Sequence, residues 1–461
     1  MSLTIEQKPK YRLIPASSNI IFTVKDDVTT ASKFKIKYTA EVYVNNRTAG
    51  LTNTVNRIAV LKVTPNGVGS GIFDLSPILQ NYVTPDYEGG TVHNSSAIYF
   101  SQYNGVDFSD NTPHTIHQVD DFSTNRNSCR FFTVRFNVEA ADSATGNVTT
   151  QYNSNTTVDD FLMYNGVLYD TDILNLDSNS NFGYNLSEEG FVMNSSTDSF
   201  LSNAPKTQYL RTTDYLTLSF FSQYDWDFEV GTAGVQYPSV RKIEIQFYNN
   251  GSTTGSLITK LIQASTGGHS GYMGDSNNKL QFAGVGTGNL VGSGETLPTN
   301  WEYYTVKEDC KEFETIRLTW LNKFGVWDYY NFTKKSVRTF NTKRKSYTQI
   351  TGTWNESKFR INGHTGGKKT YNSSISETIK LNTDYITEAE AIWLEELFIS
   401  NDVYILEERS TDNASLGYMR KYIQPATITN STHTRKTKAN DKLIQYTFNL
   451  QTTKTKKTQK I

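Results

Sequence analysis

The stretch "TEAEAIWLEELFISNDVYIL" (387–406) reads as a capped helix that runs directly into an apolar strand. Thr387 is a preferred N-cap residue, and Glu390 three positions later completes a capping box. An apolar stripe with helical spacing follows, formed by Ala389, Trp393, Leu394, Leu397 and Phe398. The sequence therefore predicts one amphipathic helix near 387–399, with Thr387, Glu390, Trp393, Leu397 and Phe398 as its structural anchors.

The chain around this helix has the character of β-structure. It contains 28 Tyr and 25 Phe, residues that favour strands. Alternating apolar and polar residues occur in "KFKIKYTAEVYV" (33–44), "CRFFTVRFNVEA" (129–140) and "KLIQYTFNLQTT" (442–453). We expect a mainly β protein built from tandem antiparallel β-sandwich domains, with few short helices. One of these helices is expected in "SPILQNYV" (76–83), where Pro77 fits the first turn.

Two polar, glycine-containing stretches suggest where domains meet. They are residues 141–157 and residues 264–300, the second of which contains "GVGTGNLVGSG". Long loops inside a compact domain are unusual, so we place boundaries near them. The expected domains are residues 1–140, residues 141–264 and residues 265–461. Within the second, Asn165-Gly166 in "FLMYNGVLY" (161–169) predicts a type I′ hairpin turn.

Composition disfavours several classes of function. The net charge is −1 over 461 residues, so no global field attracts nucleic acid or an anionic membrane. We expect no recognition of nucleic-acid sequence and no membrane insertion. The first residues lack the apolar core of a secretory signal, which predicts synthesis and folding in a cytoplasm.

No motif in the sequence predicts catalysis. His114 and His117 in "HTIHQVDD" (114–121) would point to opposite faces of a strand, which disfavours a shared metal. The acids Asp225 and Asp227 are not accompanied by a recognisable set of other catalytic residues. "GHTGGKKT" (363–370) lacks the glycine spacing of a phosphate-binding loop and reads as a basic, exposed hairpin tip. We therefore expect a protein that is not an enzyme, with no catalytic, cofactor-binding or metal-binding residues and no cofactor.

Two stretches carry a resemblance to a known group of proteins. "WLNKFGVWDYYNFTKKS" (320–336) and "ETIKLNTDYITEAEAIWLEELFISNDVYIL" (377–406) resemble virion structural proteins of tailed bacteriophages. The expected C-terminal order of strands, one flanking helix and a closing hairpin is similar to tail-tube and distal-tail domains. The resemblance implies a non-enzymatic part of a virion tail, at the hub, baseplate or tail tip. It implies a symmetric ring of identical copies and other tail proteins as partners.

The edges of β-strands suggest where such copies meet. "KLIQYTFNLQTT" has little charge to protect an exposed edge, so Tyr446 and Phe448 are candidate assembly-interface residues. Two alternatives remain open. One is a host-recognition adhesin of β-sandwich type, binding surface glycans through aromatic segments such as "YDWDF" (224–228) and "NWEYY" (300–304). The other is a neck or head-associated structural protein.

Overall fold

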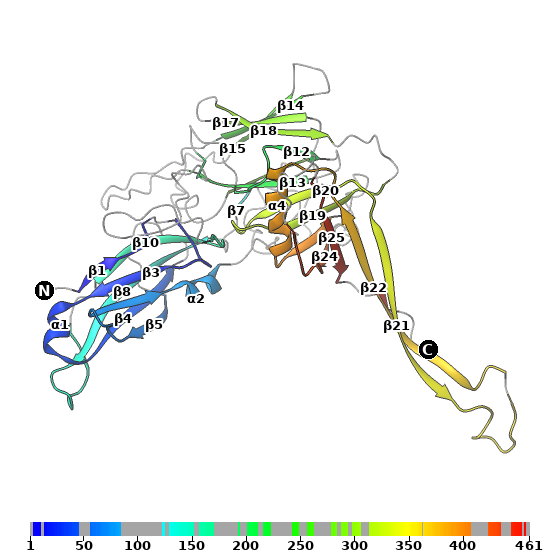
Figure 1. Ribbon diagram of the computed structural model, residues 1–461, viewed down its shortest axis with the longest axis horizontal. Helices are drawn as coiled ribbons and strands as arrows, with labels where there is room; N and C mark the ends of the chain where they lie inside the picture. The colour runs from blue at the N-terminus through cyan, green and yellow to red at the C-terminus, as the bar shows by residue number, and fades with distance from the viewer. Residues whose placement is uncertain are drawn as a thin grey trace. The chain divides into compact units, whose positions relative to one another are not determined.

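The computed structural model (Figure 1) divides the chain into two compact units, which we describe separately. Unit 1 comprises residues 1–306 and 321–328, and unit 2 comprises residues 307–320 and 329–461. The residues that the structure describes are 3–10, 13–45, 56–83, 122–124, 129–151, 156–169, 192–193, 201–210, 215–222, 242–248, 256–261, 278–283, 287–293, 297–305, 313–361, 363–406, 423–434, 444–453 and 456–457.

Unit 1 begins with two sheets that pack face to face. The smaller sheet has the order β1-β3-β6, and the larger has the order β2-β10-β8-β4-β5 with β9 paired to β8. The strands are β1 (Thr4–Gln7), β2 (Leu13–Pro15), β3 (Ile21–Lys25), β4 (Phe34–Asn45), β5 (Arg57–Val63), β6 (Ser70–Asp74), β8 (Cys129–Ala141), β9 (Thr149–Thr150) and β10 (Thr156–Tyr164). The helices are α1 (Asp27–Ser32), α2 (Ser76–Leu79) and the 3-10 turn η1 (Gln80–Tyr82).

Aromatic side chains fill the space between these two sheets. Phe22 of β3 lies 5.6 Å from Phe136 of β8, and Phe73 of β6 lies 5.5 Å from the same ring. Phe132 stacks on Phe161 at 5.4 Å. All belong to one cluster of buried residues that draws on both sheets. The expected β-sandwich is therefore present at the N-terminal end.

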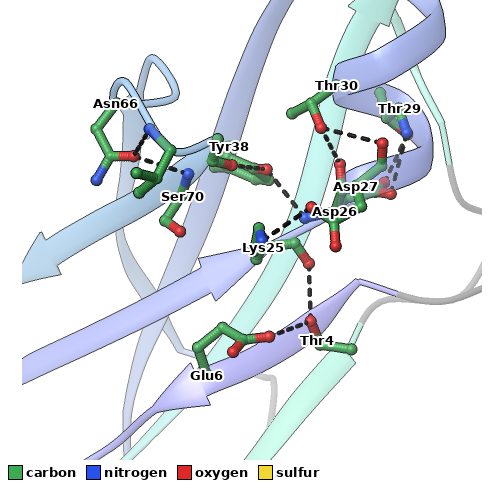
Figure 2. A network of polar contacts seen from close by, with 12 residues as sticks. Thr4, Glu6, Lys25, Asp26, Asp27, Thr29, Thr30, Tyr38, Asn66 and Ser70 are labelled. Atoms are coloured by element: carbon green, nitrogen blue, oxygen red, sulfur yellow. Dashed lines mark hydrogen bonds and ion pairs between the residues drawn. The ribbon is translucent and has the colours of Figure 1, made fainter.

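A polar network closes one end of this sandwich (Figure 2). The buried Asp26 accepts hydrogen bonds from the backbone N–H and the hydroxyl of Thr29, and so caps helix α1. The Tyr38 hydroxyl accepts from the Asp26 N–H and donates to the Gly69 carbonyl. These partners satisfy groups that would be expensive to bury alone, and they give the network a structural role.

The described strands of two further sheets lie within residues 122–305. Their orders are β11-β13-β16-β7 and β12-β18-β17-β14-β15. The strands are β7 (Phe122–Thr124), β11 (Val192–Met193), β12 (Thr207–Leu210), β13 (Tyr215–Ser222), β14 (Lys242–Tyr248), β15 (Ser256–Leu261), β16 (Asn278–Ala283), β17 (Thr287–Ser293) and β18 (Leu297–Thr305). Most pairs are antiparallel, while β2–β10, β11–β13 and β12–β18 are parallel.

Three expectations about this unit were wrong. The boundary at residue 140 fails because β10 pairs with β8 across the 142–155 connection, so one sheet continues past it. "GVGTGNLVGSG" is not only loop, since β17 pairs through its backbone with β14 and β18. The hairpin turn at Asn165-Gly166 is absent: neither residue has a positive φ, and the chain leaves β10 without forming a partner strand there.

Unit 2 is built on one sheet with the order β20-β19-β23-β24-β25-β22-β21, to which β26 adds beside β22. The strands are β19 (Ile316–Leu321), β20 (Trp327–Phe332), β21 (Val337–Gln349), β22 (Gly367–Asn382), β23 (Val403–Leu406), β24 (Ile423–Ile428), β25 (Thr447–Thr452) and β26 (Lys456–Lys457). Helix α4 (Glu388–Ile399) lies on one face of this sheet. The molecule is thus mainly β with several antiparallel sheets and few short helices, as the sequence predicts.

Candidate functional site

Helix α4 begins at the residue that the sequence indicates. The Thr387 backbone N–H donates to Glu390 Oε2 at 2.8 Å, and the Glu390 N–H donates to Thr387 Oγ1 at 3.2 Å. These reciprocal bonds make a capping box and satisfy two N–H groups that the first helical turn leaves without partners. Thr387 and Glu390 therefore fix the start of the helix.

The inner side of α4 is anchored by aromatic contacts with the sheet. Trp393 is buried, with its ring 5.2 Å from Trp320 of β19 and 5.9 Å from Tyr330 of β20. Leu397 is fully buried, and Phe398 stacks on Phe448 of β25 at 4.2 Å. These contacts hold the helix on three strands of the sheet, β19, β20 and β25. The expected stripe is wrong at one place: Ala389 is exposed, and Ala391 is buried instead.

The candidate interface residues Tyr446 and Phe448 face the interior instead. Both are buried, because residues two apart on a strand point to the same side, and here that side lies beneath α4. Phe448 also contacts Phe332 at 5.4 Å, and Tyr446 contacts His433 at 4.8 Å. Strand β25 lies between β24 and β22, so it has no free edge. Neither side chain is therefore available for an assembly interface.

The exposed part of unit 2 is a long β-hairpin, residues 337–382, which we call the arm. Strands β21 and β22 pair from Val337↔Lys380 to Gln349↔Gly367. At roughly 3.4 Å per residue, the thirteen residues of β21 span about 40 Å. Every residue of β21 except the last is exposed, and β21 is the final strand of its sheet. Figure 1 shows the arm leading away from α4 and the sheet.

The tip of the arm, residues 350–366, displays large apolar side chains. Trp354 and Ile361 are each 73% exposed and Ile350 is 70% exposed, while Phe359 is also exposed. A monomer gains nothing by placing such residues in water, and exposed apolar patches commonly mark interaction surfaces. The tip is therefore the strongest candidate for a binding surface among the residues that the structure describes.

Hydrogen bonds give the tip a defined local shape. The Thr353 hydroxyl accepts from the Arg360 N–H at 2.8 Å and donates to the Lys358 carbonyl at 2.9 Å. The indole N–H of Trp354 donates to the Thr351 carbonyl at 2.9 Å. These bonds set the exposed rings in place before any partner binds, which lowers the entropic penalty of binding.

The arm is strongly basic. Residues 341–376 contain seven Lys and Arg residues and a single acid, Glu356, for a net charge of +6. The basic residues are Lys343, Arg344, Lys345, Lys358, Arg360, Lys368 and Lys369. Because the whole chain has a net charge of −1, all other residues together carry −7. The arm thus presents apolar and positively charged groups on one projecting element.

An ion-pair cluster ties the base of the arm to the sheet. Arg338 lies 2.7 Å from both Glu314 and Glu377. Burial acts to lower the pKa of Arg338, but the hydrogen bonds and charges of Glu377 and Glu314 outweigh it and raise that pKa. Beyond this cluster the basic side chains of residues 343–345, 358, 360 and 368 are exposed, while the half-buried Lys369 donates a hydrogen bond to the His364 carbonyl.

Sequence reasoning found part of the arm and missed its extent. "GHTGGKKT" was expected as a basic hairpin tip; Gly366 and Gly367 do adopt positive φ there, and β22 begins at Gly367. Strand β21 and the first part of β22 lack apolar alternation, since they do not pack on a core; only the end of β22, at Ile379 and Leu381, is buried. The usable signal was their composition, polar and basic on both faces between apolar ends.

Other residues considered for chemistry lie outside the described residues. These are His114, His117, Asp225 and Asp227, with the aromatic segment at 224–228. Segment 300–304 lies in β18, where only the backbone is described. In the described part of the chain, no group of three His, Cys, Asp or Glu residues could hold a metal ion. Nor does any described helix have the length and apolar character required to cross a bilayer.

Comparison with known proteins gives little guidance. No protein-family model and no curated protein matches the sequence. The chain aligns with native E. coli alpha-2-macroglobulin over 82% of its length and 21% of that chain, with 8% identity and a TM-score of 0.17. It aligns with methylamine-reacted Salmonella alpha-2-macroglobulin over 97% and 23%, with 7% identity and a TM-score of 0.18. The chain spans about a fifth of either protein, and at these TM-scores the likeness carries no argument about fold or function.

Proposed function

We propose that this chain is a non-enzymatic structural subunit that assembles with copies of itself, as part of the tail of a phage virion. The observation that carries the assembly is the arm, whose apolar tip stands in water on two long strands. Such a surface is unfavourable on a free-standing protein and useful on a subunit that meets a neighbour.

The edge strand of the arm supports the same reading. An exposed strand presents unpaired N–H and C=O groups that can pair with any other chain. The run Lys343-Arg344-Lys345 lies in the middle of β21, where positive charge opposes indiscriminate pairing. The most exposed large apolar side chains of the arm, Trp354, Ile361 and Ile350, lie at the tip, although Phe340 and Tyr347 of β21 are also exposed. This division between a protected edge and an adhesive end fits an arm that engages one specific partner.

The placement in a virion tail rests on the sequence resemblance, whose two stretches, 320–336 and 377–406, lie within residues 315–406. The structure adds an account of what those residues would do in an assembly. They supply the helix-covered sheet as a rigid base and include the arm that extends from it. Such a base and arm would suit a hub, baseplate or tail-tip subunit whose role is to bind its neighbours.

The test is the association of the purified full-length chain. Sedimentation velocity over a wide concentration range should show monomers at low concentration and larger closed species as concentration rises. Negative-stain images of the large species should show rings, and the protein should be present in purified phage particles. A chain that stays monomeric at every concentration and is missing from particles would refute the proposal.

A second candidate is a glycan-binding adhesin, favoured by the exposed ring of Trp354. An exposed aromatic face offers an apolar surface on which a sugar ring can stack. The two candidates predict different results for Trp354→Ala. Loss of glycan binding by an unchanged monomer supports the adhesin, while loss of self-association supports the structural subunit.

A further inference from the structure

The outer side of helix α4 is a second surface that the fold leaves uncovered. Glu388, Ile392 and Ile399 are spaced by four and seven residues, which places them on one side of the helix. All three are exposed, Ile399 by 64%. The half-buried acids Glu395 and Glu396 flank them, and Glu395 lies 3.4 Å from His433 Nε2. We call this surface, residues 388, 392, 395, 396 and 399, the α4 outer face.

This face has more apolar area than a solvent-facing helix requires. The inner side of α4 already packs on the sheet through Trp393 and Leu397, so the outer isoleucines do not serve the core. A helix with apolar residues on both sides is typical of one that is covered on both sides. Among the described residues of unit 2, none buries Ile392 or Ile399, which are 47% and 64% exposed.

The α4 outer face and the arm tip are complementary in kind. The face combines isoleucines with Glu388 and its acidic neighbours, whereas the tip combines Trp354, Ile361 and Phe359 with basic residues. The charges of the whole chain divide in the same way, with +6 on residues 341–376 and −7 elsewhere. Apolar contact would supply the affinity and the opposite charges would set orientation and partner choice.

The tip of a given chain cannot reach its own α4 outer face. The two arm strands keep continuous antiparallel register, apart from one bulge beside Lys345, so the tip is held about 40 Å from the base of the arm. Helix α4 packs at that base, on the sheet that β22 enters beside β25. The matching surfaces therefore belong to different molecules.

We infer that the arm tip of one copy docks on the α4 outer face of the next copy. The contact is head-to-tail, because two different surfaces meet, and repeated head-to-tail contacts close into a ring or continue as a filament. This inference rests on the proposed self-assembly and specifies how it occurs. It names Trp354 and Arg360, residue types that dominate binding energy at many interfaces, as the central contacts of the tip.

Charge reversal with complementation tests the inference. The acidic-tip variant carries Lys358→Glu and Arg360→Glu, and the basic-helix variant carries Glu388→Lys and Ile399→Lys. All four side chains are exposed, so both variants should keep the parent's circular dichroism spectrum. The basic-helix variant should melt slightly lower than the parent, because Glu388 lies in the first turn of α4, where a cation is unfavourable. Each variant alone should self-associate at least about tenfold more weakly than the parent, because like charges then face each other. Mixed in equal amounts, they should associate again, since each tip now meets a helix of opposite charge.

Several results would overturn the inference while leaving the proposed function standing. One is that the parent self-associates and each variant alone self-associates equally well. Another is disruption by both variants without recovery in the mixture. Binding of the parent to phosphatidylglycerol vesicles through the tip, with the chain still monomeric, would assign the tip to a lipid surface instead. A parent that never self-associates and binds no vesicles removes the proposed function itself, and the inference with it.

Discussion

The rings of Trp354 and Phe359 meet edge to face, with centroids 5.6 Å apart, while both side chains remain largely in solvent. An aromatic pair of this geometry contributes about 0.5–1.5 kcal/mol beyond the area that it buries. That contribution organises the arm tip locally but leaves most of the apolar surface uncovered. The pair is thus prepared for a contact that the isolated chain does not make, and this links the local structure of the tip to its proposed role.

The core beneath α4 should depend strongly on one side chain. Trp393→Ala should lower the free energy of unfolding by roughly 3–5 kcal/mol, because it removes a buried ring from between the helix and the sheet. Urea denaturation at low protein concentration measures this. Ile392→Ala on the outer side of α4 is the matched control and should change stability by no more than about 0.5 kcal/mol. Equal denaturation of the Trp393→Ala variant and the parent would show that α4 is not held by this ring.

The start of α4 should depend on its capping box. Thr387→Ala should cost about 1 kcal/mol, since the Glu390 N–H loses its side-chain acceptor. Thr387→Ser keeps the hydroxyl and should retain most of the stability. If the alanine and serine variants have the same midpoint in urea, the cap contributes nothing measurable.

Strand β25 should tolerate charge on one side and not on the other. Phe448→Lys places an unpaired cation beneath α4 and should prevent unit 2 from folding. Gln451→Lys on the same strand places the charge on an exposed position and should leave folding intact. Near-ultraviolet circular dichroism and soluble yield distinguish them. A folded Phe448→Lys variant with a selective defect in assembly would restore the interface that the sequence suggested.

Asp402, which lies just after α4, should make the protein less stable as the pH rises. Burial raises the pKa of the Asp402 carboxyl, and a hydrogen bond from Tyr404 only partly opposes this. The folded state therefore binds this proton more tightly than the unfolded state does. The resulting stabilisation is complete below the unfolded pKa and is lost as pH rises through the folded pKa.

Asp402→Asn removes this titration and should flatten the dependence of unfolding free energy on pH above the unfolded pKa of an Asp carboxyl, about pH 4. The variant should gain stability relative to the parent as pH rises across that range. Denaturation series at several pH values provide the measurement, and parallel curves for the two proteins would contradict the assignment.

Local signals predicted the parts of the fold that local interactions determine. The helix at 387–399 was predicted because its N-cap, its apolar stripe and the polar residues that end it lie close together in the sequence. The strands of the N-terminal sandwich were predicted because their alternation reflects one buried face. Both features need no knowledge of distant residues.

Tertiary contacts decided the parts that were missed. Asn165-Gly166 favours a hairpin locally, but the Val167 N–H donates to the Lys323 carbonyl and the Leu168 N–H donates to the Ser18 hydroxyl. Gly325, with a φ of +74°, packs so closely on Asn165 that a Cβ there would lie 1.4 Å from the Asn165 carbonyl oxygen. These partners come from far along the chain, so the sequence alone does not reveal them.

The candidate site was missed for a different reason. Tyr446 and Phe448 were chosen because β25 reads as an unprotected edge, yet β22 and β24 flank it. The sheet ends at β20 and at β21, and the basic run of β21 resembles an ordinary solvated surface. Strand order within a sheet decides which strand is an edge, and that order depends on long-range pairing.

The most direct test of the account is the association state of a chain whose arm has been shortened. Residues 346–371 can be replaced by Asn-Gly, which joins the paired residues Lys345 and Asn372 through a two-residue turn. The base of the arm, the sheet and α4 remain in this variant. Sedimentation velocity should show the parent assembling as concentration rises and the shortened chain remaining a folded monomer. A shortened chain that assembles as readily as the parent would contradict the central role of the arm.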